Sequence, residues 1–163
     1  PALEQLNVLF RSATPEDQLR IKHKLHVGIA MSEYREQFQR GDFLIANLVG
    51  ADREQGALAI GNLVRTGQTI QFHVRDADTA DEDLRSLLTQ SLHAGAPQGA
   101  LLFSCNGRGT RLFPHPHHDA GTIQSVAGQI PLAGFFAQGE LGPVAGRNYI
   151  HGFTASVALF APG

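Results

Sequence analysis

The pattern of short apolar runs is the feature that most constrains how this chain can fold. Residues 25–30, 43–49, 100–104 and 132–137 are mostly apolar, and most of these runs are flanked by glycine, proline or polar residues. Runs of this length are typical of β-strands. None approaches the roughly 18 continuous apolar residues that a membrane-spanning helix needs. The pattern therefore predicts a globular chain built on short strands.

Further strands follow from alternation and spacing. Residues 57–60 are the expected hairpin partner of residues 43–49, and residues 68–75 alternate, with Ile70, Phe72 and Val74 on one face. We expect these three segments to form an antiparallel meander. Residues 100–104 predict a strand buried on both faces. Residues 149–160 predict one long strand.

Helices are expected before and between these strands. Residues 1–10 have apolar side chains on one face, and residues 119–130 form a weaker helical pattern. The best-defined helix has a capping box of Thr79 and Glu82, an apolar stripe that ends at Leu92, and Gly95 as its stop. The predicted fold class is α+β, with an antiparallel or mixed sheet packed with helices. The length of 163 residues fits a single domain.

Charge and cysteine content narrow the function classes. The net charge of −2 offers no basic field for nucleic acid, and we expect no membrane insertion. Cys105 is the only cysteine, so an internal disulfide is excluded and a reducing, cytoplasmic location is expected. The chain begins at Pro1, and its only methionine is Met31, which indicates a fragment of a longer protein.

The densest local signal for a site lies directly after the strand at residues 100–104. It comprises Cys105, Asn106, Gly107, Arg108 and Gly109. Glycines let loop N–H groups converge, and an arginine guanidinium suits a carboxylate or phosphate. A thiol near arginine can be reactive. The alternative is a tight turn beside an inert, buried cysteine.

A second signal is the glycine-rich segment 139–152 between two apolar strands. It presents Gly139, Glu140, Arg147, Asn148 and His151. Such loops can place polar groups over a pocket. The alternative is a hairpin with conformationally necessary glycines, in which Glu140 and Arg147 pair with each other.

The histidines favour neither a metal site nor an enzyme. Residues 115–119 contain three histidines and Asp119, but adjacent imidazoles on a proline-stiffened loop seldom converge on one ion. We expect an exposed loop in which His118 or Asp119 caps the next helix, with no metal and no cofactor. His26 reads as a surface residue. An enzyme with Cys105 as nucleophile, and His151 or His118 as base, is the least favoured interpretation.

Three ordered blocks resemble the FIST C domain family. They are residues 99–109, 131–143 and 146–156, with a weaker stretch at 43–76. The resemblance covers nearly the whole chain, so residues 1–163 are interpreted as a FIST C-like domain that lacks the FIST N domain which normally precedes it. It implies a sensory module in signal transduction that binds small ligands such as amino acids. It supplies no catalytic residues.

The residues and the resemblance together predict a small-ligand sensor that is not an enzyme. Arg108 or Arg147 would hold a carboxylate and Glu140 an ammonium group, and we expect both arginines to matter more for binding than for folding. The expected partners are the ligand, the FIST N domain and a downstream signalling protein. The alternative function is a protein–protein interaction module without a small-molecule ligand.

Overall fold

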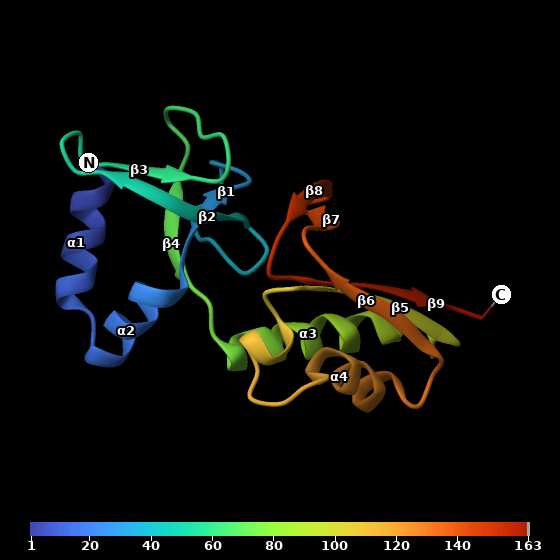
Figure 1. Cartoon of the computed structure of the whole chain (residues 1–163). Coiled ribbons are helices and arrows are strands. Elements are labelled where there is room, and N and C mark those ends of the chain that lie inside the picture. The colour runs from blue at the N-terminus through green and yellow to red at the C-terminus, as the bar shows by residue number, and fades with distance from the viewer. Residues whose placement is uncertain (163) are drawn as a thin grey trace. The chain divides into compact units, whose positions relative to one another are not determined.

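The computed structural model describes residues 1–162, apart from the side chains of Ala94 and His151. These residues form two compact units, one of residues 1–75 with 143–147 and one of residues 76–142 with the rest of the chain from 148 (Figure 1). Helices and antiparallel and mixed sheets occur together, so the predicted α+β class is confirmed.

The first unit is built on a four-stranded antiparallel sheet in the order β3-β2-β1-β4. Its strands are β1 (Leu25–Ala30), β2 (Phe43–Asp52), β3 (Ala57–Ile60) and β4 (Ile70–Val74). The predicted β2–β3 hairpin is confirmed, but the meander is wrong because β4 pairs with β1. All residues of β1 after the first are buried, so its backbone N–H and C=O groups need hydrogen-bond partners, which β2 and β4 provide along its two edges.

Two helices precede this sheet, α1 (Ala2–Ser12) and α2 (Pro15–Lys24). Sequence analysis missed α2 because the helix buries no residue and so lacks an apolar stripe. Its start does carry a local signal. The Thr14 hydroxyl accepts a hydrogen bond from the Asp17 N–H, and Pro15 occupies the first turn.

A buried histidine and a half-buried histidine face each other across strands β1 and β4 of the four-stranded sheet. His26 on β1 is directly opposite His73 on β4, and it is buried, so its assignment to the surface was wrong. The His73 ring packs edge-on against Phe43 and over Gly28, where a Cβ atom would overlap it. The His73 Nε2 atom is buried with no hydrogen-bond partner among the described residues.

Both imidazoles have a lowered pKa, which favours their neutral form. Burial lowers the pKa of His73, and the charge that His26 would carry lowers it further. Burial also lowers the pKa of His26; the hydrogen bond to the Lys24 carbonyl opposes this shift, while the charge of Arg75 adds to it.

The second unit is built on a three-stranded mixed sheet in the order β6-β5-β9. The central strand β5 (Gly99–Cys105) runs parallel to β6 (Leu132–Ala137) and antiparallel to β9 (Ala155–Phe160). A Cβ atom at Gly134 would overlap the carbonyl oxygen of Leu102, so only glycine fits at this point of β6.

Helices α3 (Ala77–Ser91) and α4 (His118–Ala127) lie on one side of this sheet (Figure 1). Leu84, Leu88, Ala100, Leu102 and Ile123 form the buried core between helices and sheet. The residues of β5 alternate between buried and half-buried, which corrects the expectation of a strand buried on both faces. Short 3-10 turns follow α3 at Leu92–Ala94 and β5 at Gly109–Arg111.

Two local predictions in this part of the chain need correction. The cap of α3 is Asp76, whose side chain accepts from the Thr79 N–H, so the helix begins before the predicted capping box. The predicted long strand divides into β8 (Arg147–His151) and β9, because Phe153 adopts a positive φ of 63°. Strand β8 pairs with β7 (Glu140–Val144) across a turn in which Ala145 and Gly146 both have positive φ.

No helix in residues 1–162 combines the length and the apolar character that crossing a membrane requires.

We expect the first unit to lose stability as the pH falls below about 6.5. The unfolded chain binds protons at His26 and His73 near that pH, whereas the folded unit, with both pKa values lowered, binds fewer. Acid therefore favours the unfolded state. Urea denaturation followed by circular dichroism over a pH series should show a weaker pH dependence in His73→Gln than in the wild type. The exposed His93 provides the control, and His93→Gln should behave as the wild type. Identical pH profiles for wild type and His73→Gln would contradict this account.

Candidate functional site

The two loops that sequence analysis singled out meet at one end of the three-stranded sheet. Strands β5 and β6 are parallel neighbours, so the loops after them leave the sheet at the same edge. The Asn106 N–H donates to the Ala137 carbonyl at 2.8 Å, and the Cys105 N–H donates to the Thr154 carbonyl at 2.9 Å. The carboxyl end of parallel strands is where α/β sheets commonly bind ligands.

Glu140 lies at this edge with an incompletely satisfied carboxylate. Its side chain is only 2% exposed. The Thr154 hydroxyl donates to Oε2 at 3.1 Å, while Oε1 is buried and has no hydrogen-bond partner among the described residues. Buried polar atoms without a partner are uncommon because their desolvation is not compensated.

Arg108, by contrast, is fully engaged within the protein. Its side chain and that of Asp119 are 6% and 5% exposed. Nε and Nη2 of Arg108 donate to the two carboxylate oxygens of Asp119 at 2.8 and 2.7 Å, and the Ser104 hydroxyl adds a third hydrogen bond at 2.6 Å. The guanidinium group is therefore bound in the two-pronged geometry that suits a carboxylate.

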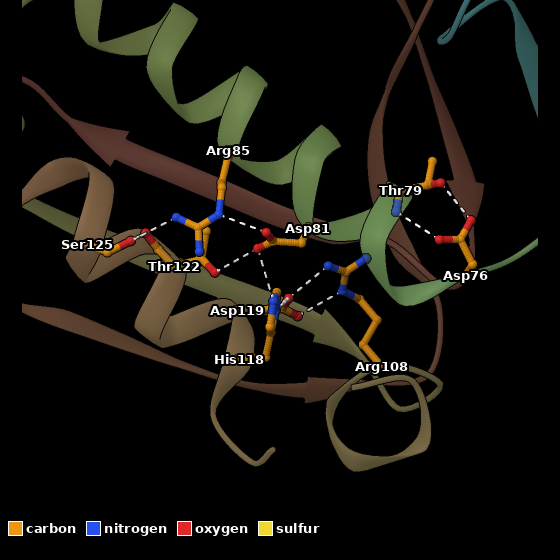
Figure 2. A network of polar contacts seen from close by, with 9 residues as sticks. All are labelled: Asp76, Thr79, Asp81, Arg85, Arg108, His118, Asp119, Thr122 and Ser125. Atoms are coloured by element: carbon orange, nitrogen blue, oxygen red, sulfur yellow. Dashed lines mark hydrogen bonds and ion pairs between the residues drawn. The ribbon is translucent and has the colours of Figure 1, made fainter. Parts of the chain in front are cut away.

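The pair continues into a polar network that joins α3 to α4 (Figure 2). His118 lies between two carboxylates, with Nδ1 3.2 Å from Asp119 and Nε2 3.0 Å from Asp81. Asp81 also accepts from Arg85 and Thr122, and Arg85 reaches Ser125. The His118 ring stacks on Phe113 at a centroid distance of 3.5 Å.

Asp119 is ionised within this network. Burial alone would raise its pKa, but hydrogen bonds from Arg108 and Ser104 and the positive charge of Arg108 outweigh burial, so the pKa of Asp119 is lowered. The pKa of Asp81 is also lowered, because contacts with Arg85, His118 and Thr122 outweigh the opposing effect of burial.

Cys105 is a buried thiol, with 7% of the residue exposed. Its sulfur accepts a hydrogen bond from the Gly107 N–H at 3.3 Å. Both ring nitrogens of His118 face carboxylates, and so this imidazole is not placed as a base for the thiol. The arrangement supports the inert alternative.

The other predicted site residues differ in their exposure and in the unit to which they belong. Asn106 and Gly139 are exposed, and Gly109 is buried with a φ of 55°. Asn148 is exposed on β8, and so is Arg147, which belongs to the segment 143–147 of the first unit. The second unit alone therefore brings together the residues from Cys105 to Gly109 with Glu140. The His151 side chain lies outside the described residues.

The histidine-rich loop does not cap α4 as predicted. His117 occupies the cap position with a φ of 60° and makes no side-chain cap, while Asp119 points into the network. His115 and His117 are exposed. Among the described residues, no group of three or more His, Cys, Asp or Glu side chains is arranged to hold a metal ion.

Sequence reasoning missed Ser104, Asp81 and Thr154 as members of this region. One signal was available for Ser104. It alternates with Ala100 and Leu102, so it shares their buried face and needs a hydrogen-bonding partner there. No local pattern identifies Asp81 or Thr154.

We expect loss of either partner of the Arg108–Asp119 pair to destabilise the fold, which reverses the expectation that Arg108 matters little for folding. Arg108→Ala leaves a buried carboxylate unpaired and should lower the free energy of unfolding by about 3–5 kcal/mol. Asp119→Ala should cost a similar amount, and the double variant less than the sum of the two. Arg85→Ala removes a half-exposed ion pair and serves as control, with an expected cost below about 1 kcal/mol. Additive effects in a denaturant-melt cycle would contradict the coupling.

We expect Cys105 to resist alkylation in the native protein. Iodoacetamide should label it slowly in buffer and rapidly in denaturant, because the buried thiol is reached only when the structure opens. A variant that combines Cys105→Ser with Asn106→Cys moves the thiol to the exposed neighbouring position and should react without denaturant. Fast native labelling at Cys105 would restore the reactive-cysteine hypothesis.

Comparison with known proteins places these features in a family. Residues 2–143 match the family model of the FIST C domain. Two uncharacterized proteins of Mycobacterium tuberculosis, from strains CDC 1551 and H37Rv, are each 49% identical over 162 residues, and one of Mycobacterium bovis is 48% identical. These alignments cover 98% of this chain but 42% of each relative, so the chain spans less than half the length of the curated relatives it matches. No solved structure gives a significant match.

The FIST C domain is associated with sensing in signal transduction. The family match extends from the first helix to the hairpin that carries Glu140 and includes the polar network around Arg108. The chain belongs to the FIST C domain family.

Proposed function

We propose that this chain is a sensory domain of a signal-transduction protein, and that it binds a small ligand where the loops after β5 and β6 meet. Free amino acids are the first class of ligand to test. The domain acts by binding and not by catalysis, and its partners are the ligand, a FIST N domain and a downstream signalling protein. The single buried cysteine favours a reducing compartment, so we place the protein in the cytoplasm.

The observation that carries this proposal is the buried Glu140 carboxylate with one unsatisfied oxygen. A buried acceptor without a donor costs free energy that an apolar residue at the same place would not. A ligand that supplies the missing donor recovers this free energy on binding. The position of Glu140 at the carboxyl end of parallel strands supports the same location.

The structure changes which residue is available to hold a carboxylate group of the ligand. Arg108 was expected to hold a ligand carboxylate, but Asp119 already occupies its guanidinium group. Arg147 is exposed and remains the sequence-based candidate for that role.

The absence of catalysis is part of the proposal. Cys105 is buried and accepts from the Gly107 N–H, and His118 is held between Asp81 and Asp119. These contacts give neither group the nucleophile–base geometry of covalent catalysis.

A protein–protein interaction module is the second candidate, and one observation favours it. An apolar groove with a volume of about 380 Å³ runs between α3 and β9 and is lined by Leu84, Leu88, Val157 and Leu159, among others. Leu87 on its wall is 55% exposed. Exposed apolar surface of this kind can receive a partner.

A thermal-shift screen separates the two candidates. We expect at least one amino acid or related metabolite to raise the melting temperature, by about 5 °C or more at a concentration near 100 times its Kd, because a ligand that binds only the folded state stabilises it. The best test protein is the full-length parent, with the present chain in parallel. A folded protein that no metabolite stabilises would favour the interaction module.

A further inference from the structure

We infer that the site recognises the protonated amine of its ligand through the carboxylate of Glu140, and that a carboxylate on the ligand is not required. This inference rests on the proposed small-ligand function and names the chemical class of the ligand. It predicts that simple aliphatic and arylalkyl amines bind where their parent amino acids bind.

Two buried carboxylates in the second unit differ in how many hydrogen bonds they receive. Asp119 and Glu140 are both at least nine-tenths buried. Asp119 receives hydrogen bonds from Ser104 and Arg108 and lies next to His118, so its negative charge is compensated. Glu140 receives the Thr154 hydroxyl on one oxygen and nothing on the other within the described part of the chain. The protein therefore satisfies the carboxylate of Asp119 with hydrogen bonds and leaves one oxygen of Glu140 without a donor.

Arg108 is not available as the counter-charge of Glu140. Among the described residues, Arg108 is the one buried arginine, and its Nε and Nη2 atoms are bound to Asp119 while Nη1 points to the Phe153 carbonyl at 3.4 Å. If Arg108 turned to Glu140, Asp119 would lose its ion-pair partner and would itself be a buried carboxylate without a counter-charge. The compensating charge for Glu140 must therefore come from outside this pair, and a ligand ammonium group supplies both the charge and the missing hydrogen-bond donors.

The same contacts determine which functional group of a ligand is recognised. A ligand carboxylate needs a free cation or a cluster of N–H donors, and Arg108 cannot supply the first. Glu140 instead presents a hydrogen-bond acceptor. This acceptor would repel a carboxylic acid that carries no amine. Amine recognition therefore dominates selection, and amines with and without a neighbouring carboxylate should both bind.

The backbone allows Glu140 to become accessible. Gly139 directly precedes it with a φ of 108°, and strand β7 begins at Glu140 itself. A left-handed glycine at the start of a hairpin tolerates rotation at little cost. Entry of an amine to the buried Oε1 atom requires a small displacement of β7 about this residue.

The test uses Glu140→Gln, which keeps the shape of the side chain and removes its charge. Without any ligand, this variant should melt at a higher temperature than the wild type, because burying an amide costs less than burying a carboxylate that lacks a full set of hydrogen bonds. A purely structural glutamate would give the opposite result. The matched control is Glu33→Gln, since Glu33 also accepts from a threonine, Thr69, but is exposed. This control should not raise the melting temperature.

The same proteins are then titrated with two series of probes. One series is leucine, isoamylamine and isocaproate, and the other is phenylalanine, phenethylamine and hydrocinnamate. Each series compares an amino acid with its amine and its acid. The wild type and Glu33→Gln should be stabilised by at least one amine and not by the acids, and Glu140→Gln should bind that amine about tenfold more weakly or worse.

The outcomes separate this inference from the proposed function. The inference is overturned if no amine stabilises the wild type, or if Glu140→Gln keeps the full effect. Stabilisation by the acids but not the amines would leave a small-ligand site in place and reject amine recognition. No response to any probe in either series would count against both.

Discussion

The buried ion pair of Arg108 and Asp119 is the interaction on which the end of the three-stranded sheet depends. Arg108 lies in the loop after β5, and Asp119 lies in the first turn of α4, the helix that leads to β6. Two desolvated charges are tolerated only when each has its full set of partners, which here includes Ser104 and His118. The pair therefore favours the one arrangement of loop, helix and strand in which both charges are paired. Other arrangements would leave a buried charge without its partner.

That single arrangement fixes where the candidate site can be. With α4 held against the end of β5, the crossover returns the chain to β6 as a parallel neighbour, with Cys105 opposite Ala137. The segments that follow both strands must then emerge together, and the start of β9 reaches the same edge through the Cys105–Thr154 hydrogen bond. Glu140 and Thr154 meet at this point. Under the proposed function, the network around Arg108 supports the site, while Glu140 contacts the ligand.

The sequence predicts local structure well where an apolar run and its flanking residues agree. The bounds of β1, β3 and β6 follow from such runs, and α3 from its stripe and its glycine stop. Prediction from the sequence fails where the structure of a segment does not depend on a local apolar pattern. Helix α2 has no buried face, and the left-handed conformation at Phe153, which divides the predicted long strand, is rare for an aromatic residue.

The site shows the same division between local and long-range information. Glycines and charges after β5 and β6 locate the two loops, because they interrupt apolar runs. The partner of Arg108 cannot be predicted locally, because α4 must fold back along the sheet before Asp119 can reach Arg108. The burial of His26 likewise depends on β1 having β2 and β4 on its two edges. Local periodicity contains none of these pairings.

The two candidate functions share one strand. Thr154, which contacts Glu140, directly precedes β9, and Ala155, Val157 and Leu159 of β9 line the apolar groove beside α3. Strand β9 is hydrogen-bonded to β5 along its whole length, so its two ends cannot move independently. A contact made by a ligand at Thr154 and a contact made by a partner in the groove would therefore act on the same element. The two candidate functions are therefore compatible: in the proposed function, a ligand would act at one end of β9 and a partner would bind along its length.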